Sequence, residues 1–223
     1  MINDLTFTGE RVVPNRTCHA QTMSEHLIRY AFATRYAKVG SILDVACGSG
    51  YGLKIMGMLG AEKNGADIDS ESVDYSREFN GQGNFYQIDF EKQSIYDKLN
   101  SIVVRTDSNW AKKFDLITSF ETIEHLDDPN LFLQGIRDCL KDDGMGISTG
   151  KFIYSIPLCN PSKYHKVVYT FKEAYDLITK YFEHEELFIQ EGIEFVNYER
   201  VKGNLEGLNK RGIFIVGVCH KKK

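Results

Sequence analysis

The sequence predicts an α/β domain with a doubly wound, mostly parallel sheet, and two observations lead to this prediction. From residue 41 onward, apolar runs of strand length alternate with segments of helical periodicity, which is the pattern of parallel strands joined by crossover helices. The first apolar run, 42–46, breaks into the glycine-rich turn Cys47-Gly48-Ser49-Gly50-Tyr51-Gly52 just before a helix. Such a turn lets a ligand approach the backbone amides at a helix N-terminus, so a nucleotide-like cofactor is the first hypothesis.

The helices and strands can be placed in order along the chain. Residues 1–22 carry few periodic apolar positions and are expected to form an irregular arm. After the arm, the pattern predicts helix 24–37, strand 42–46, helix 51–59, strand 64–68, helix 71–79, strand 84–88, strand 114–120, helix 129–140 and strand 145–149. Helix 129–140 starts at Pro129, a favoured first helical position, after the cap candidate Asp128. Residues 92–113 are less regular and leave a helix or a long loop open.

The C-terminal part combines one helix with two strand-like runs. Thr170 followed by Glu173 has the spacing of a capping box and predicts a helix over 171–181. The runs 187–189 and 213–218 are rich in β-formers, and a segment containing Gly and Asn separates them. Two such runs joined by a loop are expected to close the sheet as an antiparallel hairpin.

Composition restricts the class of protein. The 223 residues are 42% hydrophobic and 26% charged, which is ordinary for one globular domain. A net charge of −4, with Lys221-Lys222-Lys223 as the only notable basic run, predicts no nucleic-acid partner. Five cysteines without a Cys-x-x-Cys motif fit a reducing compartment. No stretch approaches the ~18 apolar residues of a spanning helix and no signal-like core is present, so we expect a cytoplasmic protein without membrane contact.

Two acidic residues follow the second and third strands. Asp67 closes its strand 19 positions beyond Gly48, the distance at which a βαβ unit brings a carboxylate to ribose hydroxyls. Asp89 follows strand 84–88. The usual dinucleotide fingerprint needs a third Gly or Ala at the position of Leu53, so this turn is a poor pyrophosphate site.

The order Asp44, Gly48, Gly50, Asp67 and Asp89 resembles that of the class I S-adenosylmethionine (SAM) dependent methyltransferases. The resemblance continues in Glu121-Thr122-Ile123-Glu124-His125-Leu126 and in the turn Leu140-Lys141-Asp142-Asp143-Gly144-Met145-Gly146, and it covers roughly residues 40–155. The stretches 8–14 and 26–30 are also similar to the opening of a bacterial subset found beside sugar- and polysaccharide-modifying genes. The resemblance implies a seven-stranded sheet with a C-terminal antiparallel hairpin, and SAM as the cofactor.

The resemblance also implies which residues contact the cofactor. They are Asp44, Ala46, Gly48, Gly50, Asp67, Ile68, Asp89, Phe90 and Glu121. Asp67 would accept hydrogen bonds from both ribose hydroxyls, with Asp69 as its rival at the same strand end. Asp89 would accept from the adenine amino group, and Ile68 and Phe90 would enclose the adenine. Asp44 lies under the loop and would fix its shape or reach the SAM amine through water.

A cationic partner for the cofactor carboxylate is expected on the first helix or in the arm. His26, Arg29 and Tyr30 fall at i, i+3 and i+4 and share one helix face. Arg29 is the candidate for this pairing because of its bidentate chemistry, and a surface charge beside a half-buried Tyr is the alternative. Arg11 is the second candidate.

Transfer to a hydroxyl benefits from a base whose pKa is near the working pH, which favours histidine. His165 follows Asn160-Pro161-Ser162-Lys163-Tyr164, a stretch that resembles the Asn-Pro-x-His of sugar-pathway enzymes with two residues inserted. His125 lies four residues after Glu121 and is either a base or a structural cap. Glu121 and His125 are the alternative ligand pair for a metal, but no ligand set such as His-Glu-x-x-His is present, so no metal is expected.

These observations predict one domain over 1–223, with an arm and helix (1–37), a cofactor-binding core (38–150) and an acceptor-side segment with the closing hairpin (151–223). The expected activity is methyl transfer from SAM to an oxygen, or in second place a nitrogen, of a small-molecule or sugar-containing acceptor. A nicotinamide-dependent oxidoreductase and a non-catalytic SAM-binding protein are the alternatives. The sequence leaves the acceptor and homo-oligomerisation open.

Overall fold

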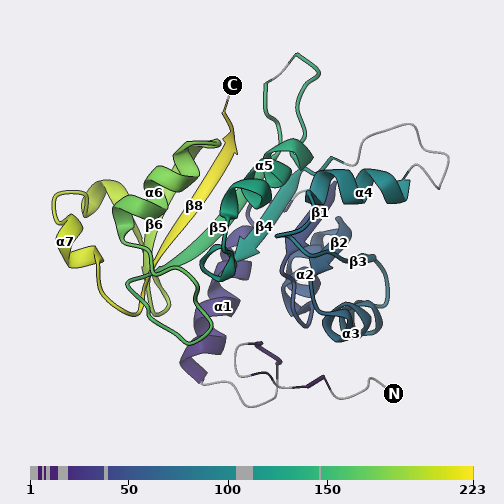
Figure 1. Ribbon diagram of the computed structural model, residues 1–223, viewed down its shortest axis with the longest axis horizontal. Coiled ribbons are helices and arrows are strands. Elements are labelled where there is room, and N and C mark those ends of the chain that lie inside the picture. Colours follow the sequence, from purple (N-terminus) through teal and green to yellow (C-terminus); the bar gives the residue numbers. More distant parts are fainter. Residues whose placement is uncertain are drawn as a thin grey trace.

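The computed structural model describes residues 5–6, 8, 11–14, 20–37, 40–103, 113–145 and 147–222. Much of the predicted arm, residues 104–112 and Gly146 lie outside the described residues. The fold is a single eight-stranded sheet in the order β3-β2-β1-β4-β5-β8-β6-β7, with helices on both faces (Figure 1). No helix in the described part of the chain has the length and apolar character needed to cross a membrane.

The strands and helices alternate as predicted over the first two thirds of the chain. The strands are β1 Ser41–Val45, β2 Glu62–Asp67, β3 Asn84–Gln87, β4 Leu116–Phe120, β5 Lys151–Leu158, β6 Phe182–Glu191, β7 Glu194–Asn197 and β8 Ile213–Lys221. The helices are α1 Ala20–Ala33, α2 Tyr51–Met56, α3 Ser70–Asn80, α4 Ile95–Val103, α5 Pro129–Cys139, α6 Phe171–Thr179 and α7 Leu205–Leu208, with short 3-10 helices η1 Gly57–Leu59, η3 Ile123–His125 and η4 Tyr198–Arg200.

Helices cover the sheet from two sides, which confirms the doubly wound arrangement (Figure 1). One apolar cluster joins the sheet to α4, α5 and α6 through residues such as Leu99, Phe132 and Ile178. The other cluster joins it to α1, α2 and α3 and includes Leu53 and Val73. Burial of both sheet faces explains why the central strands are continuously apolar in sequence.

The caps predicted for α5 and α6 form as expected. The Thr170 side chain accepts from the backbone N–H of Glu173, and the Glu173 carboxylate accepts from the N–H of Thr170. Asp128 caps α5 by accepting from the N–H of Asn130 at 2.9 Å, with Pro129 at the first helical position. These local signals set the first residue of each helix. Both helices lie on the same face of the sheet.

The predicted strand at 145–149 is wrong, because strand β5 begins only at Lys151. The residues before it form a turn in which Asp143 Oδ1 accepts from the N–H groups of Met145 and Ile147 at 2.9 Å each. Met145 is 84% exposed and Ile147 is 51% exposed. The strand in this part of the chain is instead formed by the buried residues 152–158 of β5.

The C-terminal strands confirm an antiparallel closure and correct the strand count from seven to eight. Strand β8 pairs antiparallel with both β5 and β6 and thus lies between them. Strand β6 is longer than the predicted run 187–189 and continues through a turn at Gly192, where φ is +58°, into β7. Strand β7 was not predicted because Glu194–Asn197 is short and only partly buried, so its apolar alternation is weak.

Candidate functional site

A cleft of about 540 Å³ lies at the carboxyl ends of the central strands. Its walls come from the segments that follow β1, β2 and β4, from α1, and from the 160–165 segment after β5. In doubly wound sheets, ligands bind at this edge, where the crossover connections leave the sheet on opposite faces. A second cavity of about 370 Å³, between β6, β7 and α7, contains none of the predicted site residues.

The glycine-rich turn after β1 forms one wall of the cleft and adopts backbone angles that favour glycine. Gly48 has φ +52° and Gly50, which caps α2, has φ +74°. A Cβ on Gly50 would lie 2.7 Å from Asn80 Nδ2 and 2.9 Å from Ser76 Cβ. Ser76 Oγ donates to Gly48 O at 2.7 Å, and Asn80 Nδ2 donates to Gly50 O at 3.1 Å. Helix α3 therefore holds the turn in shape, and the predicted proximity of the backbone to a ligand is sterically feasible.

Asp67 at the end of β2 faces this turn. Its Oδ2 accepts from the N–H of Gly48 at 2.8 Å and its Oδ1 accepts from the N–H of Asp69 at 3.0 Å. The side chain is nearly enclosed, and burial raises the carboxyl pKa while the two amide hydrogen bonds oppose the rise. Ile68, the next residue, is 55% exposed and lies on the cleft wall. The structure therefore brings Gly48, Asp67 and Ile68 together as predicted.

The rival acid, Asp69, has a different environment. Its carboxylate caps α3 by accepting from the N–H of Ser72 at 2.9 Å and accepts from Arg11 Nη2 at 2.5 Å. These contacts hold the Asp69 pKa below its usual value despite partial burial. Arg11 lines the cleft as well. Asp69 thus has a helix N-terminus and a cation as partners, whereas Asp67 has two backbone amides.

Asp44 lies beneath the turn and is fully buried. Thr118 Oγ1 donates to its Oδ1 at 2.6 Å, and Tyr30 Oη donates to its Oδ2 at 3.0 Å. Burial raises the Asp44 pKa to about 7, although both hydrogen bonds lower it. Asp44 thus joins β1, β4 and α1 beneath the turn, and its role in fixing the loop stays a prediction.

We expect Asp44→Asn to change how the free energy of unfolding depends on pH. A carboxyl whose folded-state pKa is about 7, against 3.8 unfolded, destabilises the fold as pH rises through this window. A difference of about three pH units corresponds to ~4 kcal/mol. Urea unfolding between pH 4 and 8 should therefore show the wild-type protein losing stability relative to the variant. Parallel pH curves for the two proteins would contradict this expectation.

Glu121 follows β4 and is the acidic centre of the cleft. Arg29 Nη1 donates to Glu121 Oε1, and His26 Nε2 lies 2.8 Å from the same oxygen. Burial alone would raise the Glu121 pKa, but Arg29 and His26 together hold it well below its usual range. His26 Nδ1 also lies 2.9 Å from Tyr51 Oη. Glu121 is thus a fixed negative charge on the cleft wall.

Arg29 is fully buried behind Glu121 and does not line the cleft. Its Nε donates to Gln190 Oε1 at 2.6 Å, and its guanidinium lies 4.2 Å from the centre of the Phe214 ring. In this structure Arg29 reaches the cleft only through Glu121. His26 and Tyr30, the two other members of that helix face, both line the cleft.

The predicted adenine contacts at 89 and 90 lie elsewhere in the structure. The Phe90 ring is buried in the core, with its centre 5.6 Å from that of Phe132. Asp89 Oδ2 lies 2.8 Å from Lys92 Nζ, and this hydrogen bond lowers the Asp89 pKa. Neither residue is among the described residues that line the cleft. The contacts of Asp89 and Phe90 with adenine therefore stay predictions.

The two candidate bases, His125 and His165, line the cleft together. Their ring centres are 5.0 Å apart with the planes nearly perpendicular. His125 Nδ1 lies 3.1 Å from Tyr164 O, and His165 Nδ1 lies 2.7 Å from Asn160 O. Since a carbonyl only accepts, each Nδ1 carries a proton, and in the neutral ring Nε2 is then the nitrogen with the lone pair. Burial lowers the His125 pKa, which favours its neutral form.

Three non-glycine residues with positive φ occur at the same edge of the sheet. In the described part of the chain these are Ala46 (+59°), Glu121 (+51°) and Cys159 (+44°). They directly follow β1, β4 and β5, which are neighbours in the sheet. Such conformations cost about 1–3 kcal/mol each and persist where the surroundings impose them, often at functional sites. Two of these three residues, Ala46 and Glu121, are also predicted site residues.

Sequence similarity to known proteins covers more than half of this chain. A family model described as a methyltransferase domain matches residues 19–149. A ubiquinone biosynthesis O-methyltransferase of Actinobacillus pleuropneumoniae serotype 5b (strain L20) is 34% identical over 104 residues, which cover 47% of this chain and 42% of the relative. The corresponding protein of Xanthomonas axonopodis pv. citri (strain 306) is 28% identical over 59% of this chain and 50% of its own length. The chain thus spans about half the length of the curated relatives it matches or less.

Solved structures share the fold at low sequence identity. The N-methyltransferase NodS of Bradyrhizobium japonicum WM9, in complex with S-adenosyl-L-homocysteine (SAH), has a TM-score of 0.62 at 10% identity, covering 93% of this chain and 90% of its own. A TehB-like SAM-dependent methyltransferase of Corynebacterium glutamicum ATCC 13032 has a TM-score of 0.57 at 17% identity, covering 87% and 86%. Both matches extend beyond the cofactor half of the chain to the C-terminal strands.

Proposed function

Because the chain belongs to the methyltransferase-domain family of class I SAM-dependent enzymes, we propose that it transfers the methyl group of SAM to an oxygen of a small-molecule or sugar-containing acceptor. The observation that carries the proposal is that one cleft contains both the glycine turn with Asp67 and two histidines from later parts of the chain, His125 and His165. The O-methyltransferase names of the sequence relatives support oxygen over nitrogen.

The cofactor side of the cleft fits the proposal in its hydrogen-bonding capacity. A carboxylate offers about four lone-pair sites, and the Asp67 oxygens use one each for Gly48 and Asp69. Two sites remain for ribose hydroxyls. The charge of Glu121 attracts the ammonium group of the methionine portion, with the backbone at Ala46, Gly48 and Gly50 beside it. For the adenine end we retain Ile68, Asp89 and Phe90 as candidates.

When bound, SAM supplies an activated methyl group for in-line displacement, so the chain mainly has to align the acceptor and exclude water. Nε2 of His165 or His125 receives the proton of the acceptor hydroxyl. The fixed Nδ1 protons orient both rings for this task. Arg29 and His26 position Glu121, which would hold the ammonium group of the cofactor.

The test is a calorimetric titration with SAM, SAH and NAD in parallel. We expect micromolar binding of the two sulfur compounds, and a loss of roughly 100-fold in Asp67→Ala, because hydrogen bonds to a charged group contribute about 1.5–3 kcal/mol each. Asp74→Ala is the matched control, since Asp74 is an exposed acid on α3 whose partner is Arg77. Binding of NAD alone would support the oxidoreductase alternative, and unchanged SAM affinity in Asp67→Ala would refute the assigned cofactor site.

A further inference from the structure

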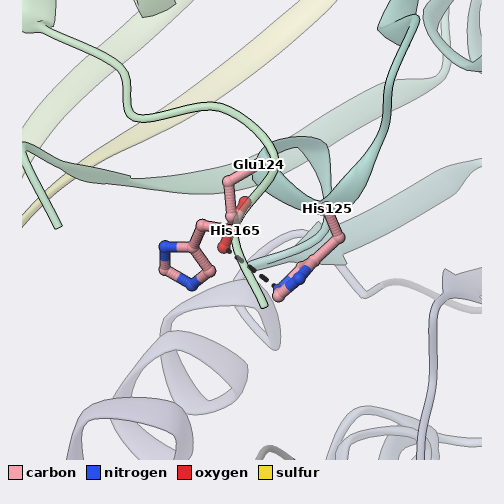
Figure 2. A group of neighbouring side chains, drawn as sticks. All are labelled: Glu124, His125 and His165. Carbon is pink, nitrogen blue, oxygen red and sulfur yellow. Dashed lines mark ion pairs between the residues drawn. The ribbon is translucent and has the colours of Figure 1, made fainter. Parts of the chain in front are cut away.

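Glu124, His125 and His165 bring three metal-ligating side chains to one point beside the cleft (Figure 2). One ligand atom from each side chain lies within 4.8 Å of the other two. We propose that these residues bind a divalent transition-metal ion. We did not expect this ion from the sequence, because the ligands come from η3 and from a loop 40 positions later and no spacing motif links them.

The distances are compatible with coordination after a small adjustment. Three atoms within 4.8 Å of one another lie no more than about 2.8 Å from a common centre, and Zn–N and Zn–O bonds are about 2.0–2.2 Å. His125 Nε2 and Glu124 Oε1 are 3.8 Å apart. In Figure 2 the Glu124 carboxylate lies between the two imidazole rings. Side-chain movements of less than about 1 Å would complete the three bonds.

The hydrogen bonds around the histidines are those of a metal site. Metal-binding histidines almost always donate their other ring N–H to a carbonyl, a carboxylate or water, which fixes the ring and its tautomer. His125 and His165 both do so, through Nδ1 to Tyr164 O and to Asn160 O. Both Nε2 lone pairs are thereby prepared for a ligand without any change of tautomer.

The two ligand-bearing segments are held together by the backbone. The N–H groups of Lys166 and Val167 both donate to Glu124 O, at 2.8 and 3.1 Å. The Lys166 ammonium points to acids outside the site, at 2.6 Å from Asp127 and 3.1 Å from Glu91. Its positive charge is thus neutralised there. The loop carrying His165 is fixed to the helix carrying Glu124 and His125, and this preorganisation lowers the cost of binding an ion.

Two imidazole nitrogens and one carboxylate oxygen select the kind of metal. This set suits zinc, iron, cobalt and related ions and leaves coordination positions open. Magnesium and calcium prefer oxygen ligands only. We therefore expect Zn²⁺ and Co²⁺ to bind far more tightly than Mg²⁺.

The open positions of the ion face the cleft, because His125 and His165 line it. An acceptor hydroxyl bound there would lose its proton to solvent more readily, since a bound cation lowers the pKa of an oxygen ligand. This role rests on the proposed function: the ion would take over proton removal from the histidine nitrogens, while the C–S bond of the donor breaks as the new C–O bond forms.

The experiment uses the full chain after treatment with a chelator and its removal. We would titrate it with ZnCl₂ by calorimetry, with CoCl₂ by visible absorption, and with MgCl₂, all without SAM or acceptor. We expect one ion per chain, with affinity at least tenfold lower in His165→Ala and Glu124→Gln and unchanged in His220→Ala, a histidine paired with Glu183 on another part of the sheet.

Melting temperatures without metal show whether each variant is folded, and His165→Ala, which changes a loop residue, keeps the test valid if Glu124→Gln does not fold. Absence of Zn²⁺ and Co²⁺ binding, or binding that survives in His165→Ala, would refute the metal site. Because the titration needs no SAM, its outcome is independent of the methyltransferase proposal, which fails only if SAM does not bind or no methyl group is transferred.

Discussion

Glu121→Gln is expected to lower the free energy of unfolding by about 3–5 kcal/mol, because it leaves the buried Arg29 guanidinium without its countercharge. Gln190 and Phe214 still contact Arg29 in the variant, but neither carries a charge. Urea unfolding at pH 7 measures the effect. The double variant Glu121→Gln/Arg29→Met should recover part of the stability, because it removes the buried charge together with its partner.

The pH dependence of this effect has a definite sign. The folded-state pKa of Glu121 lies well below the usual 4.5 of a glutamate, so its contribution to stability is present above about pH 4.5 and is lost as pH falls through the folded-state value. The difference between wild type and Glu121→Gln should therefore shrink in acid. Glu183→Gln, which changes an exposed glutamate, is the control. Equal stability of wild type and Glu121→Gln at pH 7 would show that the ion pair between Glu121 and Arg29 does not stabilise the fold.

His165→Ala and His125→Ala are expected to reduce the rate of methyl transfer by roughly 10²–10⁴-fold each, the usual contribution of a positioned acid or base. SAM affinity should stay close to that of the wild type, since the Nδ1 hydrogen bonds of both rings go to the 160–164 segment. Rates are measured by SAH formation with an acceptor from a screen of hydroxyl-bearing compounds. His220→Ala serves again as the matched variant with full activity.

The pH profile and a chelator distinguish the roles of the two rings. A base works in its neutral form, and burial lowers the His125 pKa, so a His125 base would stay active at a pH below the usual histidine range. If a bound metal ion promotes proton removal instead, activity should fall when the chelator is added and return with Zn²⁺ or Co²⁺. Full activity in both alanine variants would leave the protein as a SAM binder without a histidine-dependent transfer step.

The sequence was sufficient for those parts of the fold and site that depend on neighbouring residues. The alternation of strands and helices, the glycine turn and the caps at Asp128 and Thr170 are local signals, and the structure confirms them. The pairing of Asp67 with Gly48 was also accessible, because a βαβ unit fixes the separation of its two strand ends.

The parts that the sequence did not predict depend on distant contacts. Met145 and Ile147 resemble strand residues, but the side chain of Asp143 stabilises a turn there and the strand follows later. The place of Arg29 behind Glu121 depends on Gln190, 161 positions away. The meeting of His125 with His165 depends on a loop that the chain brings back over η3. No local pattern encodes these contacts.

The position of β8 has a consequence for the order of folding. This strand comes after β6 and β7 in sequence, yet it lies between β5 and β6, so the outer strands have no direct pairing with the rest of the sheet until β8 enters. Such late, nonlocal pairing slows folding, because the chain must close a large loop before the contacts form. Phe214 on β8 and Gln190 on β6 both contact Arg29, the support of Glu121. A chain that has completed only its first five strands therefore already has the glycine turn, but Arg29 lacks the contacts that hold it against Glu121. Binding of the cofactor should then report the last folding step.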